Sequence, residues 1–371
     1  MRRAILQITR TAYELLARPL LFRTLTAQAA HEQALRLCAY FDEHPQPLGR
    51  LQRYLLPPQP CMVGGVNLPQ PLMLAAGFVK GTGFATEEDA QKAVACGDNI
   101  IPGWRSVPAL LGAVEFGSYT RWPRLGNPGN VLWRNIGGRR SLQNRVGLKN
   151  PGARAAAAFL GAHKAHLPPL FGLNIAVSPG VSDETQEKRE VLEATAAFLE
   201  ADVRPAWFTL NLSCPNTEDD PAGRQSEALA RHLCAAVVPQ VAPTPLWVKI
   251  SPNLSAAQLH GLLRACAETG VRALIATNTL AQPTPDDDSV QGGMSGERLF
   301  GAALATVRAL AAERERQAYT IDIIACGGVL DGAAYHAYRQ LGVQAVQYWS
   351  ALVYRGPLAA ALIAQEASEI A

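Results

Sequence analysis

The amino-acid sequence predicts an α/β fold, a (β/α)8 TIM barrel preceded by a small α-helical extension. After residue 60, short apolar runs of strand length alternate with longer Ala- and Leu-rich segments of helical pattern. This alternation implies parallel strands joined by right-handed crossovers. Eight such runs in a chain of 371 residues fit a closed barrel of this kind.

Each predicted strand is a short run rich in apolar residues. The eight runs cover residues 72–75, 113–116, 171–175, 207–212, 246–250, 273–277, 321–325 and 345–348. Residues 62–68 are predicted to form a small hairpin that plugs the bottom of the barrel. Residues 98–111, which contain Pro102, Gly103 and Pro108, are interpreted as a loop insertion in the first βα unit.

The first 53 residues are predicted to form a separate helical domain. They are dense in Leu, Ala, Arg and Gln, and Pro19 is expected to separate two helices. The proline-rich stretch 45–60 is interpreted as a linker, which assigns residues 54–371 to the barrel domain.

Charged and apolar residues are unevenly distributed along the chain. Residues 1–40 carry six arginines and two glutamates, a formal charge of +4, whereas the whole chain carries +3. The leucines among these arginines never form the run of about 18 apolar residues that a membrane span requires. A basic amphipathic segment lying on a membrane surface fits this pattern. The alternative is a helical hairpin packed on its own domain.

Composition argues against several classes of protein. The net charge of +3 gives no broad nucleic-acid signature, and 48% hydrophobic residues argue against disorder. The seven cysteines are scattered and include no CxxC pair, so the sequence predicts neither a disulfide framework nor a zinc site. A reducing compartment is the better interpretation. The sequence shows no NAD-binding motif and no iron–sulfur cysteine cluster.

The active site of such a barrel lies at the C-terminal ends of its strands, where small and polar residues gather in this sequence. Lys249 lies inside the apolar run Leu-Trp-Val-Lys-Ile, where a buried ammonium requires a partner anion. A lysine that extends to the surface is the alternative. The other predicted strand ends carry Ala76-Gly77 with Lys80, Gly117-Ser118, Asn174, Thr277-Asn278-Thr279, Gly327-Gly328 and Ser350-Ala351.

The stretch 211–217 carries the densest polar chemistry. Asn211 and Asn216 each offer two donors and an acceptor, enough to hold a flat polar ring such as a pyrimidine. Cys214, between them, can remove a proton as a thiolate. The alternative is a strand end with a buried cysteine and an asparagine-capped turn.

The turns after the last two predicted strands have the chemistry of a phosphate cradle. In Gly327-Gly328 and Ser350-Ala351, backbone N–H groups can meet an anion. Together the strand ends describe a phosphate-bearing planar cofactor and a second planar polar ligand, for which flavin mononucleotide (FMN) and a pyrimidine are the candidates. An enzyme is favoured over a binding scaffold, because Lys249, Cys214 and the asparagines are all present.

Several motifs, in order, make the chain similar to the dihydroorotate dehydrogenases over almost its full length. This resemblance implies FMN-dependent oxidation of dihydroorotate to orotate in pyrimidine biosynthesis. The motifs are Leu74-Ala75-Ala76-Gly77, Asn144-Arg145-Val146-Gly147-Leu148, Asn211-Leu212-Ser213-Cys214-Pro215-Asn216-Thr217, Val248-Lys249-Ile250-Ser251-Pro252, Ile275-Ala276-Thr277-Asn278-Thr279, Gly292-Gly293-Met294-Ser295-Gly296, Cys326-Gly327-Gly328 and Arg355-Gly356-Pro357.

The resemblance implies a role for each matching residue. Cys214, Lys249 and Thr217 are the implied catalytic residues: Cys214 would take the C5 proton of the substrate, and Lys249 would stabilise the reduced flavin. The implied substrate contacts are Lys80, Asn144, Arg145, Val146, Gly147, Leu148, Asn211, Asn216, Asn278 and Thr279. The implied cofactor contacts are Ala76, Gly77, Lys80, Ser118, Asn174, Asn211, Lys249, Thr277, Gly296, Gly327, Gly328, Tyr348, Trp349 and Ser350.

The N-terminal extension resembles that of the membrane-associated, quinone-reducing class 2 enzymes. His31 and Arg134 fall where that class has a quinone-tunnel histidine and a quinone-contacting arginine. The resemblance therefore implies a membrane quinone as electron acceptor. It also implies a peripheral protein on the cytoplasmic face of the inner membrane. A histidine that is merely packed or capped is the alternative for His31.

Some positions depart from the class 2 pattern. Cys214 stands where class 2 has a serine base and Leu148 where it has phenylalanine, and both residues are typical of the soluble class 1 enzymes. Val79 also replaces the usual aspartate before Lys80. These departures leave two alternatives: a soluble acceptor such as fumarate, or a divergent enzyme that oxidises a related cyclic substrate.

Overall fold

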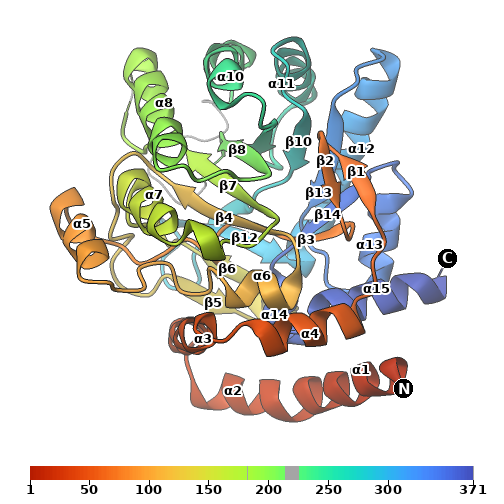
Figure 1. Ribbon diagram of the computed structural model, residues 1–371. Helices are drawn as coiled ribbons and strands as arrows, with labels where there is room; N and C mark the ends of the chain where they lie inside the picture. Colours follow the sequence, from red (N-terminus) through yellow and green to blue (C-terminus); the bar gives the residue numbers. More distant parts are fainter. Residues whose placement is uncertain (182, 214–224, 371) are drawn as a thin grey trace.

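The computed structural model describes residues 1–181, 183–213 and 225–370. Figure 1 shows a barrel ringed by helices, with the N-terminal helices packed beneath it in that view. Both chain termini lie on the right-hand side of this view.

Eight parallel strands form a closed barrel, which confirms the predicted fold class. Every predicted strand run overlaps one of them, because parallel strands are buried on both faces and their sequences are nearly continuously apolar. Around the barrel the strands are β10 (Ala273–Ala276), β13 (Asp322–Cys326), β14 (Ala345–Tyr348), β3 (Leu72–Leu74), β4 (Val114–Tyr119), β7 (Phe171–Ala176), β8 (Trp207–Asn211) and β9 (Leu246–Ile250).

Helices follow the strands and cover the outside of the barrel. Several begin at a side-chain cap, and at α11 Ser255 and Gln258 form a complete capping box. The helices are α5 (Glu87–Ala95), α6 (Ser106–Leu111), α7 (Ala153–Ala162), α8 (Glu184–Glu200), α10 (Glu227–Val241), α11 (Ala256–Glu268), α12 (Glu297–Arg316), α13 (Gly332–Arg339), α14 (Ser350–Arg355) and α15 (Ala359–Ile370), with short 3-10 turns η2 (Ile136–Gly138) and η3 (Lys164–His166).

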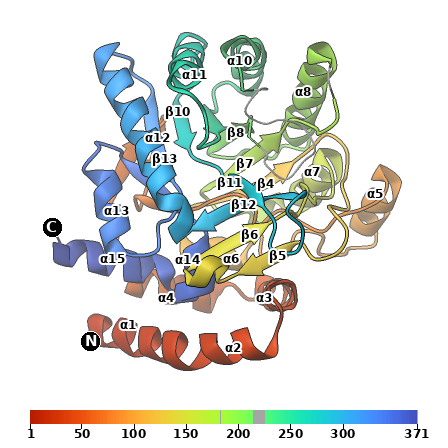
Figure 2. The ribbon, with the colours of Figure 1, turned by 180° about the vertical axis from the view of Figure 1, so that it is seen from behind.

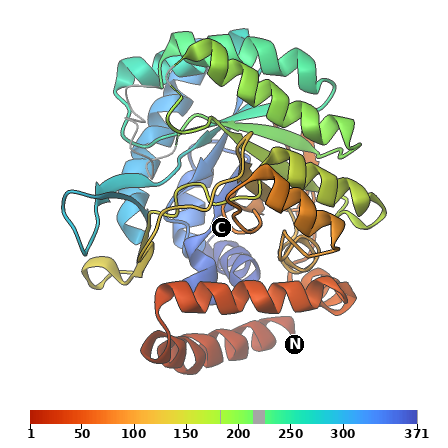
Figure 3. The same cartoon turned by 90° about the vertical axis from the view of Figure 1, so that its left-hand side faces the viewer.

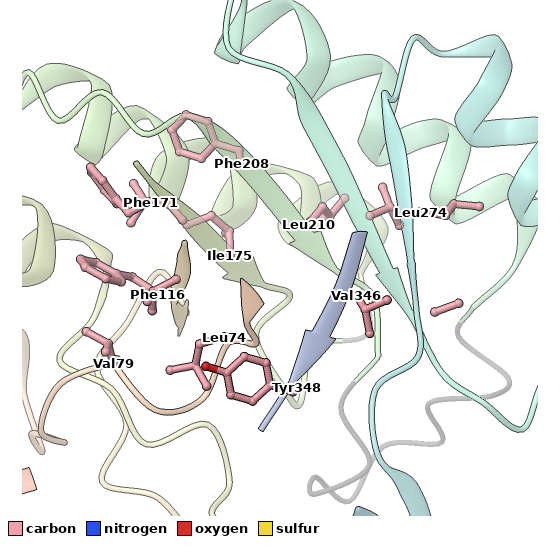
Figure 4. Close-up of a cluster of buried hydrophobic side chains, with 14 of the residues drawn as sticks. Leu74, Val79, Phe116, Phe171, Ile175, Phe208, Leu210, Leu274, Val346 and Tyr348 are labelled. Carbon is pink, nitrogen blue, oxygen red and sulfur yellow. The ribbon is translucent and has the colours of Figure 1, made fainter. Parts of the chain in front are cut away.

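Two hydrophobic clusters hold the barrel together. The larger one fills the space between strands and helices, and Figure 4 shows Phe116, Phe171 and Phe208 in it. The smaller one lies inside the barrel and includes Val63 and Leu68 of the segment that precedes the first barrel strand. In it the rings of Trp207 and Trp247 stack with centroids 4.5 Å apart. Alternation of side chains along each strand separates the two clusters, because successive residues point to opposite faces.

A hairpin closes the bottom of the barrel, as predicted. It consists of β1 (Cys61–Val63) and β2 (Val66–Leu68). The Gly64 N–H donates a hydrogen bond of 2.7 Å to the carboxylate of Asp322, which begins β13. A side chain at position 64 would collide with Trp247, so the hairpin fits only with glycine there.

A second, antiparallel sheet lies beside the strand ends and was not predicted. Its order is β11 (Leu280–Pro283), β12 (Gln291–Gly296), β6 (Ser141–Asn144) and β5 (Leu132–Arg134). Figure 2 shows this sheet extending from the barrel above α14 and α3. Its strands come from two loops that are far apart in sequence, and their pairing carries Asn144 to the site.

The N-terminal segment is helical, but Pro19 does not separate two helices. α1 (Arg2–Ala12), the π-helical turn η1 (Tyr13–Ala17) and α2 (Arg18–Thr24) follow one another without a gap, and the chain turns at Leu25. Pro19 lies in the first turn of α2, directly after the wider π turn. A widened turn can accommodate a residue that lacks an N–H and crowds the preceding carbonyl.

The predicted linker is largely a helix. After α3 (Ala27–Asp42), residues 46–55 form α4 (Gln46–Leu55), with Pro47 in its first turn. Proline is well tolerated there, because the first turn of a helix does not use its N–H groups. Figure 3 shows the N-terminal helices running below the barrel in that view, on the side of the C-terminal strand ends and not of the hairpin. No helix in the described part of the chain is both long and apolar enough to cross a membrane.

The segment 98–111 also differs from the predicted loop, because it ends in helix α6. The buried Asp42 at the end of α3 anchors it. Its carboxylate accepts from the backbone N–H groups of Gly103, Arg105 and Ser106 at 2.8–3.0 Å. The segment therefore joins the barrel to the N-terminal helices.

Candidate active site

One cavity of about 1090 Å³ connects the C-terminal ends of the barrel strands to the N-terminal helices. Most residues predicted to bind ligands line it, although they come from elements spread along the chain. These are His31, Ala76, Gly77, Lys80, Ser118, Arg134, Asn144, Val146, Leu148, Asn211, Lys249, Thr277, Asn278, Thr279, Gly296, Gly327, Gly328, Tyr348, Trp349 and Ser350.

Lys249 brings a positive charge to the inner end of the cavity. Its side chain is buried, so the alternative of a surface-extended lysine does not apply. The Nζ atom lies 3.4 Å from Oε1 of Gln347 and beside the Cys326 thiol. A buried cation that faces a cavity favours an anionic or electron-rich ligand there.

Three asparagines present amide groups on one side of the cavity. Asn211 donates to the Ser118 hydroxyl at 3.2 Å and accepts from the Ser213 N–H at 3.1 Å. Asn278 donates to the Ser213 carbonyl, and its own Oδ1 accepts from the Thr279 N–H at 2.8 Å. Asn144 donates from β6 of the second sheet to the Gly293 carbonyl. These bonds fix the amides for recognition of a planar polar ligand.

A glycine turn and two serines also line the cavity. Gly327 and Gly328 have φ values of +131° and +70°, and a Cβ on either would collide with α12. The Ser295 and Ser350 hydroxyls lie 3.0 Å apart. The turn is therefore tight and rich in small and polar groups, as a phosphate cradle requires.

Three rings lie between the strand ends and the N-terminal helices. His31 of α3 has its ring centroid 5.8 Å from that of Phe78 and 6.4 Å from that of Trp349. Burial, together with the charges of Lys80 and Lys149, lowers the pKa of His31 to about 4. This histidine is therefore neutral at physiological pH, and can donate or accept a hydrogen bond without carrying charge.

Arg134 lies where the N-terminal segment turns. Its guanidinium donates to the carbonyls of Phe22 and Leu25 at the end of α2, and it lies 4.3 Å from the centroid of the Phe22 ring. Its position at the cavity wall agrees with the expectation of a ligand contact. The structure shows a structural role for Arg134, which satisfies terminal carbonyls of a helix.

A few predicted residues lie elsewhere. Arg145 and Gly147 do not line the cavity, and the Arg145 side chain instead donates to the Pro128 carbonyl at 3.1 Å. Asn174 is fully buried behind the cavity wall. Tyr348 does line the cavity, but its side chain also packs in the larger core cluster (Figure 4). Cys214, Asn216 and Thr217 lie outside the described residues.

Sequence reasoning missed several residues of the site. Cys326 and Gln347 line the cavity close to Lys249, and Glu115 lies fully buried next to Gln347. The signal that singled out Lys249, a polar residue inside an apolar strand, is equally present at Glu115 and Gln347. The residues of α1 and α2 that line the outer cavity carry no such signal.

The fold and the site together define a (β/α)8-barrel enzyme whose site lies at the strand ends. The sequence profile of the family described as dihydroorotate dehydrogenase matches residues 61–370. The chain therefore belongs to the dihydroorotate dehydrogenase family, whose members depend on a flavin.

The similar proteins include two bacterial enzymes named dihydroorotate dehydrogenase (quinone). The one from Salinispora arenicola is 32% identical, with 93% of this chain and 96% of the relative covered. The one from Methylococcus capsulatus is 31% identical, with the same coverage. A solved structure of DHODH from Eimeria tenella in complex with ferulenol superimposes with a TM-score of 0.74 at 22% identity, covering 93% of this chain and 91% of that one. This last likeness concerns the fold.

Proposed function

We propose that this chain oxidises dihydroorotate to orotate with bound FMN and passes the electrons to a membrane quinone. The observation that carries the proposal is the single cavity that runs from the polar strand ends to an apolar channel between the N-terminal helices. The names of the bacterial relatives support the same reaction. A soluble acceptor is not favoured, because such an enzyme has no need of this channel.

The residues present fit FMN. The buried Lys249 offers a cation, and the Gly327-Gly328 turn with Ser295 and Ser350 offers a close approach for a phosphate. When bound, FMN supplies the hydride acceptor of the reaction.

The chain's own residues position the substrate and move its proton. The amides of Asn144, Asn211 and Asn278 hold the ring, and the proposed base Cys214 removes the C5 proton in a water-poor pocket. Asn216 is proposed to bind the substrate, and Thr217 is proposed to assist catalysis. Lys249 stabilises negative charge that develops at its end of the cavity.

The N-terminal helices are proposed to form the quinone domain, residues 1–53, on a barrel domain of residues 54–371. Leu15, Leu16 and Leu20 are each more than 60% exposed on one helical segment, which supports contact with a membrane surface. The proposed surface is the cytoplasmic face of the inner membrane. His31, which is neutral, and the cationic Arg134 would then contact the quinone ring at the end of the channel.

The proposal is tested by separating the two halves of the reaction. The purified protein should contain FMN, identified by mass spectrometry, and dihydroorotate should bleach its absorbance without oxygen. Dihydrouracil should bleach it far more slowly. Absence of flavin after reconstitution, or bleaching by neither compound, contradicts the proposal.

The quinone channel is tested by filling it. Ala34, on α3, lines the cavity, so Ala34→Phe should strongly reduce turnover with a short-chain quinone while leaving flavin reduction by dihydroorotate nearly unchanged. Ala12→Phe, at an exposed position that does not line the cavity, is the matched control and should affect neither step. Full quinone turnover by Ala34→Phe places quinone binding elsewhere.

A further inference from the structure

A fully buried carboxylate lies inside the barrel, and nothing in the proposed reaction uses it. Glu115 of β4 accepts hydrogen bonds from Asn174 Nδ2 at 2.5 Å, Gln347 Nε2 at 2.8 Å and Trp207 Nε1 at 3.3 Å. The three donors come from three other strands. A buried carboxylate is costly unless its oxygens are satisfied, and here neutral donors satisfy them.

Glu115 fixes the orientation of Gln347, and Gln347 meets Lys249. Because Nε2 of Gln347 donates to Glu115, its Oε1 is turned to Lys249, whose Nζ lies 3.4 Å away. The thiol of Cys326 lies within hydrogen-bond reach of the same ammonium. An ammonium has three N–H donors, and with these two partners a third remains for the cavity that Lys249 lines.

The same carboxylate orients Asn174. Its Nδ2 donates to Glu115, so its buried Oδ1 is left as an acceptor without a partner in the described part of the chain. Glu115 thus fixes two amides and, through one of them, a cation. Its own negative charge lies in a poorly screened interior, where charges act over longer distances than in water.

We propose that Glu115 is a positioning residue that holds Lys249 through Gln347 and partly offsets its charge, and thereby sets the balance between oxidised and reduced flavin in the site. This inference rests on the proposed binding of FMN. Without the carboxylate, the ammonium is no longer offset, and the negatively charged reduced flavin is favoured over the oxidised form.

The experiment measures the midpoint potential of bound FMN and its dissociation constant in the full-length protein. Glu115→Gln should raise the preference for reduced over oxidised flavin about tenfold, which is about 30 mV for a two-electron couple. Gln347→Met should also raise the preference for reduced over oxidised flavin. Because both changes interrupt one chain of contacts, the double variant should shift no further than the larger single variant.

Glu313→Gln is the matched control. Glu313 is a buried carboxylate on α12 with Arg316 and Gln317 as partners, and its substitution should leave the flavin potential unchanged. An unchanged potential in Glu115→Gln, or shifts that add in the double variant, overturns the inference. If Glu115→Gln does not fold, the flavin potential of Gln347→Met alone tests the inference. An unchanged potential in that variant overturns the inference. A folded wild-type protein that binds no FMN refutes the proposed function instead.

Discussion

The Arg355 guanidinium donates to the Glu14 carboxylate across 2.7 Å, although 341 residues separate the two in sequence. Arg355 is 2% exposed and also pairs with Glu366 of α15 at 2.6 Å. Nearby, the Tyr13 hydroxyl donates to the Val353 carbonyl at 3.0 Å. The N-terminal segment is therefore attached to α14 and α15 by partly buried polar contacts, which hold it over the cavity.

Glu14→Gln should loosen this attachment. The amide cannot match the charge of Arg355, while Glu366 still compensates it, so we expect a loss of about 1–2 kcal/mol in the free energy of unfolding. Urea unfolding and limited proteolysis before residue 25 measure it. Glu43→Gln, at an exposed position, should change neither. Equal protease resistance in both variants would show that the contact contributes nothing to docking.

His31 should make stability pH-dependent between about pH 4 and 6.5. Its pKa is about 4 in the folded protein, below the value of about 6.5 in unfolded chains, so the unfolded state binds the proton more readily in this range. Stability should therefore rise with pH across it, by about 2–3 kcal/mol from this group.

The variant His31→Gln should remove this part of the slope, and His44→Gln, at an exposed position, should retain it. Urea unfolding at several pH values measures the slope. If His31→Gln keeps the full pH dependence of the free energy of unfolding, a group other than His31 causes it.

Gly327→Ala should weaken flavin binding. A Cβ at position 327 would lie 2.6 Å from that of Ala303, and the φ of +131° is unfavourable for alanine. We expect a loss of more than about 1 kcal/mol of stability together with a raised FMN dissociation constant. Gly301→Ala is the matched control on α12, where nothing lies within 4 Å of the new methyl group, and it should stabilise by roughly 0.5–1 kcal/mol. A Gly327→Ala protein that binds FMN as tightly as the wild type argues against the cradle.

The sequence predicted the barrel well, because strand burial leaves a simple signal in each strand. It also predicted that Lys249 is buried in a strand, because a single charged residue in an apolar run is easily noticed. The second sheet was missed, because β12 is rich in glycine and its pairing partner β6 is more than a hundred residues away. The local pattern of apolar and polar residues does not indicate which distant strands pair.

The errors at Pro19 and Pro47 have a common physical cause. Proline was taken as a breaker, but each proline lies where the local geometry tolerates a missing N–H: Pro47 is in the first turn of α4, and Pro19 follows the wider π turn of a continuous helical segment. The role of residues 98–111 could not be predicted, because it depends on Asp42, more than fifty residues away.

Cys214→Ser tests the proposed base. An unperturbed thiol has a pKa of about 8.5, whereas a serine hydroxyl is almost never ionised, so the variant should reduce its flavin more slowly and at higher pH. Cys214→Ala should lose about 10²–10⁴-fold in rate. FMN binding and reoxidation by quinone should be nearly unchanged in both. Stopped-flow reduction across pH measures this, and equal rates in all three proteins assign the proton to another group.

Asp42→Ala tests whether the segment 98–111 carries the channel. The carboxylate accepts three backbone N–H groups and the side-chain amide of Asn99, the last at 2.9 Å, and the carboxylate is buried. Its removal leaves several buried donors unsatisfied, so we expect a loss of about 3–5 kcal/mol in the free energy of unfolding.

The same variant should impair one half-reaction more than the other. α6 lines the cavity on the side of the N-terminal helices, so its displacement should raise the KM for quinone while flavin reduction by dihydroorotate stays within a few-fold of the wild type. Glu43→Ala, next to it but exposed, is the control and should alter neither stability nor KM. If Asp42→Ala lowers both half-reactions equally, the segment supports the whole barrel rather than the channel, because a defect confined to the N-terminal helices cannot slow a reaction at the strand ends.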